Sequence, residues 1–189
     1  IGTAASIAIS SMKQIPQTIV MGITNIPMLN ADIVTGISLM LAFIAFGVSL
    51  GFKTVLIAHI TFNIPYVILS VMPKLKQTDK STYEAALDLG ASAGLALRKV
   101  VIPQLIPGIV SGFMLSVTLS LDDYFITTYT KPSTFDTIST YVVNATKGSH
   151  TESKTALWAF STLIFVVIVA GVLAWNLLAD RKAGAENER

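Results

Sequence analysis

Long apolar stretches separated by short polar ones constrain this chain more than any other feature. The stretches 54–72, 103–121 and 156–179 each come close to the ~20 residues that a helix needs to cross a bilayer. Inside lipid, every backbone N–H and C=O must be bonded within the protein, so only helices and closed barrels span membranes. With 52% hydrophobic and 13% charged residues, the sequence predicts an all-α, polytopic membrane helical bundle.

The N-terminal third is less regular. The segment 15–50 is apolar but longer than one crossing requires, and Pro27, Asn30 and Asp32 interrupt it. We predict one bent span with a broken or re-entrant middle, because backbone groups freed by proline must be satisfied within protein or water. Residues 1–12 are interpreted as the tail of a span, so we expect an N-terminally truncated bundle with at least one further span upstream.

A polar segment at about 74–102 separates two of the apolar stretches. Ser81 is expected to cap a helix there, and Glu84, three residues on, to reach back to the cap amide in a capping box. Gly90 then lets the chain turn, or lets a partner backbone approach closely. Such a capped helix followed by a glycine predicts a docking surface.

The spacing of Glu84-Ala85-Ala86, Gly90 and Val100-Val101-Ile102-Pro103 resembles the EAA signature of permease subunits of binding-protein-dependent ABC importers. That family usually ends the signature with Ile-x-Leu-Pro, so Val100 and Ile102 are mild departures. The resemblance implies a type I ABC importer permease fold over 1–182, with short coupling helices that sit in a cleft of an ATPase subunit. The implied coupling residues are Glu84, Ala85, Ala86, Gly90 and Pro103.

Basic residues predict the orientation. If the segment 74–102 faces the cytoplasm, most lysines and arginines lie on that side, as the positive-inside rule requires. The segment at about 122–155 is then an external polar loop, 183–189 is part of a disordered, charged cytoplasmic tail, and the chain is a multi-pass protein of the bacterial inner (cell) membrane. The cytoplasmic set is Lys13, Lys74, Lys76, Lys80, Arg98, Lys99, Arg181, Lys182 and Arg189, and the external set is Lys53, Lys131, Lys147 and Lys154.

The run Ser120-Leu121-Asp122-Asp123 is similar to the spermidine/putrescine branch of the same family. Two carboxylates at a helix C-terminus interact unfavourably with its dipole, and near a membrane they need a partner or a wet cavity. A cationic polyamine on the translocation path is one such partner. Lysines or water at an interfacial helix end are the alternative, which the residues alone favour.

Two other ionisable residues are candidates for the solute path. His59 lies four residues before Asn63 on one helical face, and an intramembrane ionisable group is a functional candidate. A neutral histidine bonded to a neighbouring helix explains it as well, and we favour this structural role. No carboxylate is matched to it, so no metal site is expected. Asp32 either lines the path or caps the helix that restarts after the break, and we favour the cap.

Small residues recur every four positions along the stretch 103–121. Such a stripe lets transmembrane helices approach closely. It predicts either packing inside the subunit or the seam with a second permease subunit. The residues are Gly108, Gly112, Ser116 and Ser120.

The expected function is that of a transport subunit for a small solute, most like a polyamine permease. No Gly-rich phosphate loop is present, so we expect no cofactor and no enzyme activity in this chain, with ATP and Mg²⁺ bound by a partner. The resemblance implies as partners two copies of an ABC ATPase subunit, a second permease subunit (homologous or identical), an extracytoplasmic solute-binding protein and the lipid membrane. A formal charge of +2 does not suggest nucleic acid.

Three alternatives stay open. In the first, the chain belongs to an importer whose solute is not a polyamine but a metal ion, a phosphonate or thiamine. A secondary carrier coupled to ions would instead use His59, Asp32 and Asp122 and need no ATPase. A membrane scaffold would use the capped helix only to recruit a soluble protein. Neither of the last two explains the EAA spacing.

Overall fold

The computed structural model describes residues 1–147 and 151–187, and among these it contains helices and no strand. The chain divides into two compact units, 1–135 and 136–189. We describe each unit by itself. The predicted all-α architecture is confirmed.

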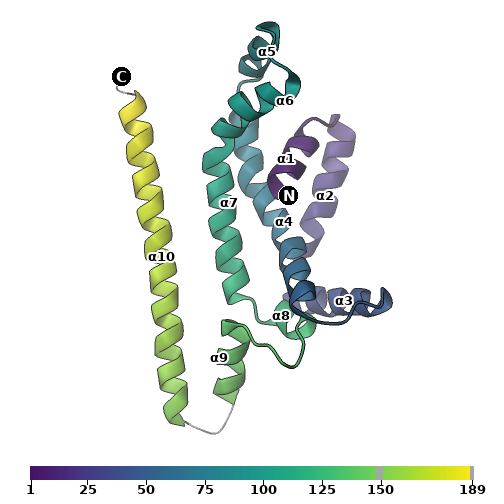
Figure 1. Ribbon diagram of the computed structural model, residues 1–189, viewed down its shortest axis with the longest axis vertical. Helices are drawn as coiled ribbons and strands as arrows, with labels where there is room; N and C mark the ends of the chain where they lie inside the picture. Colours follow the sequence, from purple (N-terminus) through teal and green to yellow (C-terminus); the bar gives the residue numbers. More distant parts are fainter. Residues whose placement is uncertain (148–150, 188–189) are drawn as a thin grey trace. The chain divides into compact units, whose positions relative to one another are not determined.

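Helices α4 (Phe52–Gln77) and α7 (Ile102–Asp122) form the centre of the first unit and lie side by side (Figure 1). Their backbones approach closely at the glycines of α7. A Cβ atom built on Gly108 would lie 3.1 Å from the Ser70 carbonyl oxygen, and one on Gly112 would lie 3.3 Å from the Val67 Cα. A larger residue at either position would crowd α4, as expected for small residues between membrane helices.

Two further helices, α1 (Gly2–Ser10) and α2 (Gln14–Leu29), pack against α4. After α2, the chain bends by 106° into α3 (Asp32–Ala45), so the predicted break in the segment 15–50 is confirmed. The break falls within the expected interval: Pro27 lies inside α2, and the extended residues are Asn30 and Ala31. Proline is tolerated near the end of a membrane helix where neighbouring groups satisfy the freed carbonyl.

The short helix α8 (Phe125–Thr130) packs between α3 and α4 at the start of α4. Gly36 of α3 makes this possible, because a Cβ atom there would lie 3.2 Å from both the Ile126 Cα and the Phe125 carbonyl oxygen. The Thr54 hydroxyl of α4 lies 2.8 Å from the Thr130 carbonyl oxygen and donates to it. This end of the unit is therefore held by backbone contact as well as by apolar packing.

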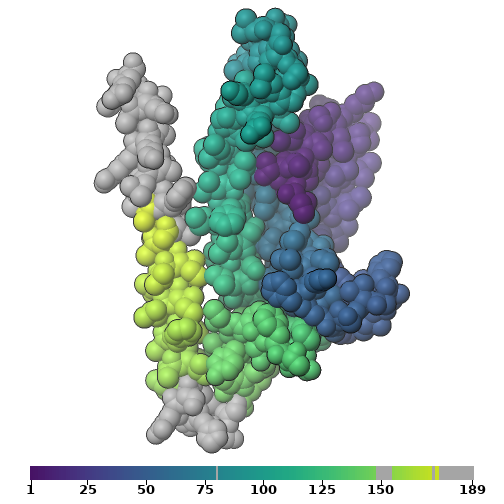
Figure 2. Space-filling view, in the orientation of Figure 1, coloured from purple at the N-terminus to yellow at the C-terminus, as the bar shows by residue number. Residues whose placement is uncertain are grey.

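At the opposite end of the α4–α7 pair lie α5 (Lys80–Asp88), α6 (Ala93–Ala96) and the π-helix Leu97–Val101. We call residues 78–101 the α5–α6 loop. Figure 2 shows this loop projecting beyond α1 and α2 at one end of the unit. The half-buried Tyr83 packs against the cluster of Val71, Val101 and Leu105, which joins the loop to both long helices.

By length and composition, the helices Phe52–Gln77 and Ala93–Asp122 are each able to cross a membrane, and the bent pair α2–α3 makes a third candidate among the described residues. The second unit holds α9 (Ile138–Lys147) and α10 (Thr151–Asn187). The segment 122–155, predicted as a polar loop, contains α8 and α9. One expectation is corrected here: the charged tail, expected to be disordered, continues α10 as helix through Asn187. Glu188 and Arg189 lie outside the described residues.

Candidate functional site

The start of α5 differs from the expected capping box. Asp79, not Ser81, is the N-cap residue, and its carboxylate accepts a 2.9 Å hydrogen bond from the Ser81 backbone amide. This bond lowers the pKa of the Asp79 carboxyl below its ordinary value, so the cap stays charged at neutral pH. Thr82 then occupies the N3 position, and Glu84 lies two residues too far along the helix to close a box; its side chain is exposed. Asp79 is favoured over Ser81 as the cap because its negative charge also interacts favourably with the helix N-terminus.

The end of α5 is a Schellman motif built on Gly90. The Gly90 amide donates to the Leu87 carbonyl at 2.8 Å, and the Ala91 amide donates to the Ala86 carbonyl at 3.1 Å. Gly90 has φ = +85°, a backbone conformation that residues with a Cβ atom rarely adopt. Gly90 thus sets the direction in which the chain leaves α5, and Ser92 then caps α6 by accepting from the Leu95 amide at 3.4 Å.

Two faces of α5 are distinct. Tyr83 turns toward the rest of the unit, while Glu84 and Ala85 are exposed and Ala86 is half-buried. The outward face also carries Leu89, which is 89% exposed. Sequence reasoning missed this residue, although a leucine directly before the C′ glycine of a helix was a signal that could have found it. Leu89 is thus an exposed apolar side chain on the protruding loop.

Prolines and the π-helix shape the start of α7. The Ile102 amide donates to the carbonyl of Leu97, five residues back, which is the π-helical pattern. Pro103 follows directly in the first turn of α7, and Pro107 lies one turn later inside it. Proline lacks an amide hydrogen and is accommodated where regular α-helical bonds are already interrupted. Pro103 is exposed, at the junction where the α5–α6 loop continues into the long helix.

A polar cluster occupies the other end of the α4–α7 pair, and we call it the His59 cluster. Its members are His59 of α4, Ser120 of α7, Asp123 after α7 and Thr127 of α8. The His59 Nε2 atom lies 2.8 Å from the Thr127 hydroxyl and 3.5 Å from Asp123 Oδ2, and its Nδ1 atom lies 2.6 Å from the Ser120 hydroxyl. The structure thus corrects the premise that no carboxylate is matched to His59.

Hydrogen-bond directions in the His59 cluster follow from one donor. The Thr127 hydroxyl donates to Asp123 Oδ2 at 2.7 Å, so it accepts from His59, whose Nε2 atom must carry a hydrogen. In a neutral imidazole, Nδ1 then accepts from the Ser120 hydroxyl. Every polar atom of the His59 ring is therefore bonded, which agrees with the structural role favoured for it and ties α4, α7 and α8 together.

The two adjacent carboxylates have different environments. The Asp123 side chain is 5% exposed and accepts from the backbone amides of Ile126 (3.2 Å) and Thr127 (2.7 Å) at the start of α8. The C-terminal dipole of α7 was expected to disfavour the Asp123 carboxylate. The carboxylate instead binds the N-terminus of α8, whose dipole favours a negative charge. Asp122 is the last residue of α7 and is exposed. Of the pair, only Asp122 is exposed.

The remaining candidates are also located. Asp32 is exposed in the first turn of α3, where Ala31 is the N-cap residue and makes no side-chain cap bond, so the expected Asp32 cap is wrong. The stripe of small residues faces α4: Gly108 and Gly112 contact it, the half-buried Ser116 bonds back to its own helix, and Ser120 bonds His59. Within the described parts of the chain, no three His, Asp or Glu side chains gather as a metal site would require.

Comparison with known proteins adds independent information. Residues 1–184 match the family described as binding-protein-dependent transport system inner membrane component. The spermidine/putrescine transport system permease protein PotC of Haemophilus influenzae is 34% identical over 181 residues, which cover 96% of this chain and 69% of PotC. PotC of Escherichia coli strain K12 is 32% identical, with 96% and 68% covered. The putrescine transport system permease protein PotI of the same strain is 33% identical, with 81% and 56% covered.

Proposed function

Because this inner-membrane chain belongs to the family of membrane components of binding-protein-dependent transport systems, we propose that it is the permease subunit of an ATP-driven importer for polyamines. The observation that carries the importer class is the α5–α6 loop. It projects from two spanning helices, and its Schellman turn at Gly90 presents the outward face of α5. ATP and Mg²⁺ belong to a separate ATPase subunit that docks on this face.

The assembly follows from the same family membership. Two ATPase copies bind the α5–α6 loops of this chain and of a second permease subunit, which places the loop in the cytoplasm. A solute-binding protein delivers its cargo on the other side of the membrane, where the His59 cluster lies. Glu84 and Ala85 contact the ATPase, Gly90 shapes the contact, and Pro103 connects it to α7.

Polyamine as the solute is supported by the PotC and PotI relatives and by the position of Asp122. A polyamine carries protonated amines, and an exposed carboxylate at the end of a spanning helix attracts cations. Asp123 has a different role, because its carboxylate oxygens already bind the start of α8 and the His59 cluster. Asp123 positions α8, and Asp122 contacts the passing cation.

The test of the importer class is co-purification of the full-length subunit with the proteins encoded beside it. We expect an ATPase to co-purify, and spermidine-loaded binding protein to stimulate ATP hydrolysis. Leu89→Ser should lower the affinity of the subunit for the ATPase about tenfold, since truncating a central apolar anchor typically costs more than 1 kcal/mol. Phe46→Ser is the matched control, because Phe46 is 84% exposed but lies at the opposite end of the unit. Equal ATPase recovery with both variants would contradict the role of Leu89, whereas no ATPase at all, or uptake driven by a proton gradient alone, would contradict the importer.

The role of Asp122 is tested by spermidine uptake into vesicles that contain the assembled transporter. Asp122→Asn should reduce uptake several-fold at low ionic strength, with a smaller loss at high salt, because exposed charges are screened. Assembly and unfolding temperature should stay unchanged, since Asp122 is exposed. Uptake equal to that of the unmodified protein would leave Asp122 as a solvated helix end and return the solute to the open alternatives.

A further inference from the structure

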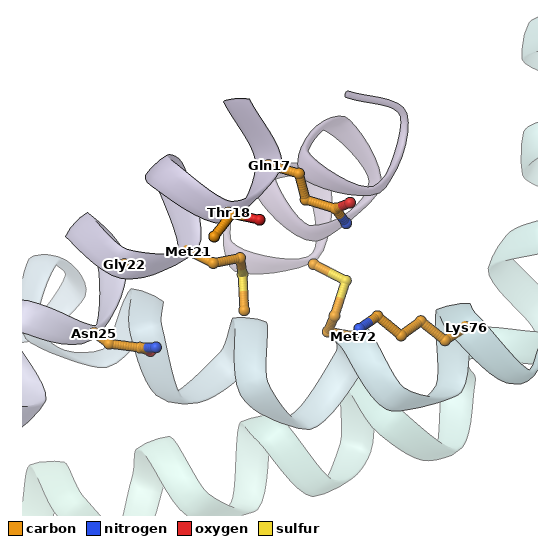
Figure 3. Close-up of a pocket in the computed structure, with 7 residues that line it drawn as sticks. All are labelled: Gln17, Thr18, Met21, Gly22, Asn25, Met72 and Lys76. Atoms are coloured by element: carbon orange, nitrogen blue, oxygen red, sulfur yellow. The ribbon is translucent and has the colours of Figure 1, made fainter. Parts of the chain in front are cut away.

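The proposed function leaves unused a pocket between α2 and α4. Figure 3 shows it from the side, with its polar side chains spread along the two helices. Its volume is about 460 Å³. The lining residues are Gln17, Thr18, Met21, Gly22 and Asn25 from α2 and Met72 and Lys76 from α4.

The rim of the pocket suits an anion. The Lys76 side chain extends along α4 toward Met72, and the Gln17 side chain approaches from α2 (Figure 3). Lysine donates through a full positive charge and glutamine through its amide. The Thr18 hydroxyl already donates to the Gln14 carbonyl at 2.9 Å, so its oxygen is left to accept. No carboxylate lines this pocket, so a cation such as a polyamine would meet the positive charge of Lys76 with no negative charge to offset it.

The inner end of the pocket requires a polar partner. The Asn25 Oδ1 atom is buried and has no hydrogen-bond partner within the described structure. Leaving an amide oxygen unbonded in an apolar setting costs free energy. Because the oxygen and nitrogen of an amide exchange places by a simple flip, the flipped amide puts Nδ2 in the buried position, where it donates to an acceptor such as an ester carbonyl. Between this end and the rim, the side chains of Met21 and Met72 give an apolar, adaptable wall.

The position of the pocket along α4 sets its expected depth. Lys76 is the next-to-last residue of α4, which is long and apolar enough to span a membrane, so we expect the rim at the membrane boundary beside the α5–α6 loop and Asn25 deeper. A phospholipid is the molecule that carries a phosphate at that boundary and ester carbonyls and acyl chains below it. Basic pockets between spanning helices on the cytoplasmic side bind such head groups.

We propose that this pocket binds an anionic phospholipid, with its phosphate on Lys76 and Gln17, an ester carbonyl on Asn25 and an acyl chain along Met21 and Met72. Phosphatidylglycerol is the head group that fits best, because its negative charge is not balanced by an amine and its glycerol hydroxyls donate to the Thr18 oxygen. The proposal does not depend on the solute and rests on the proposed orientation only for the choice of leaflet.

Two variants isolate the pocket. Lys76→Gln removes the charge and keeps most of the side-chain length. Gly22→Leu fills the pocket sterically, and it should fold because no atom lies within 4 Å of a Cβ built on Gly22. Lys74→Gln is the matched control: Lys74 lies in the same last turn of α4, but its Cγ faces Gly108 of α7 at 3.1 Å from the built Cβ. Glutamine keeps that Cγ in place.

The experiment is native mass spectrometry of the full-length subunit within its purified transporter, titrated with phosphatidylglycerol and, separately, phosphatidylcholine. We expect preferential phosphatidylglycerol binding that falls about fivefold in Lys76→Gln, the effect of one lysine near a membrane surface, and disappears in Gly22→Leu. Lys74→Gln should bind as the unmodified protein does, and inorganic phosphate should not displace the lipid.

Each contrary result overturns a definite part of the proposal. Equal losses in Lys76→Gln and Lys74→Gln would make the effect one of general surface charge, and undiminished binding in Gly22→Leu would place the lipid elsewhere. A photoreactive side chain at Met21 that cross-links to protein instead of lipid would show that another polypeptide segment fills the pocket. None of these results bears on ATPase co-purification or spermidine uptake, which test the proposed function independently of the lipid.

Discussion

Gly90→Val is expected to reduce solute-stimulated ATP hydrolysis about tenfold or more in the assembled transporter, without preventing membrane insertion. At φ = +85°, a residue with a Cβ atom is strained by roughly 1–2 kcal/mol, and a β-branched one is less tolerated still. The strain is relieved by opening the Schellman turn, which re-aims the outward face of α5. The measurement is ATP hydrolysis with loaded binding protein, together with recovery of the ATPase on the purified subunit.

Gly90→Asn separates backbone strain from bulk. Asparagine is similar in size to valine but adopts the left-handed conformation far more readily, so this variant should keep activity within about threefold. A Cβ at Gly90 meets no atom of this chain within 4 Å, so a steric effect would have to come from the docked ATPase. If asparagine impairs coupling as much as valine does, Gly90 acts by contact with the partner and the turn argument is wrong.

Asp123→Ala is expected to destabilise the first unit by about 3–5 kcal/mol, because it leaves several partly buried donors without an acceptor and each unsatisfied donor costs about 1–3 kcal/mol. The substitution leaves the Ile126 and Thr127 amides and the Thr127 hydroxyl without their acceptor. For a chain of this size the unfolding temperature should fall on the order of 10 °C. Thermal unfolding of the purified subunit in detergent gives the measurement.

Asp122→Ala is the control for this second result, since the two residues are adjacent and only their burial differs. It should change the unfolding temperature by no more than about 2 °C, because exposed substitutions away from packed features are nearly neutral. Similar losses for the two variants would mean that the buried hydrogen bonds of Asp123 contribute little. In that case both carboxylates would again be candidates for contact with the solute.

Local pattern was enough to predict the helices, the break near residue 30 and the position of Gly90. Each depends on features within a few residues: apolar length, a missing amide or a glycine after a helix. The start of α5 was mispredicted because Asp79 and Ser81 are both good N-cap residues two positions apart, and pattern alone does not rank them. The Asp32 cap failed for a related reason, since the chain leaves α2 in an extended form that Ala31 continues.

The His59 cluster could not be predicted from sequence. His59 and Thr127 are 68 positions apart, and their contact exists only because α8 turns back beneath α4. Asp123 appeared to sit at an unfavourable helix C-terminus until α8 supplied a second, favourable helix end. The pocket at Lys76 was missed in the same way, because it depends on how α2 lies against α4 rather than on any motif in either helix.

The α4–α7 pair, described above as two helices in close backbone contact, has a mechanical consequence. The α5–α6 loop joins the two helices at one end and the His59 cluster joins them at the other. We therefore expect the pair to tilt as one rigid body. The 26 residues of α4 span about 39 Å at 1.5 Å per residue. A tilt of ~10° about the loop end would carry the far end sideways by roughly 7 Å. A displacement of this size would change how open the polar end of the pair is to a solute.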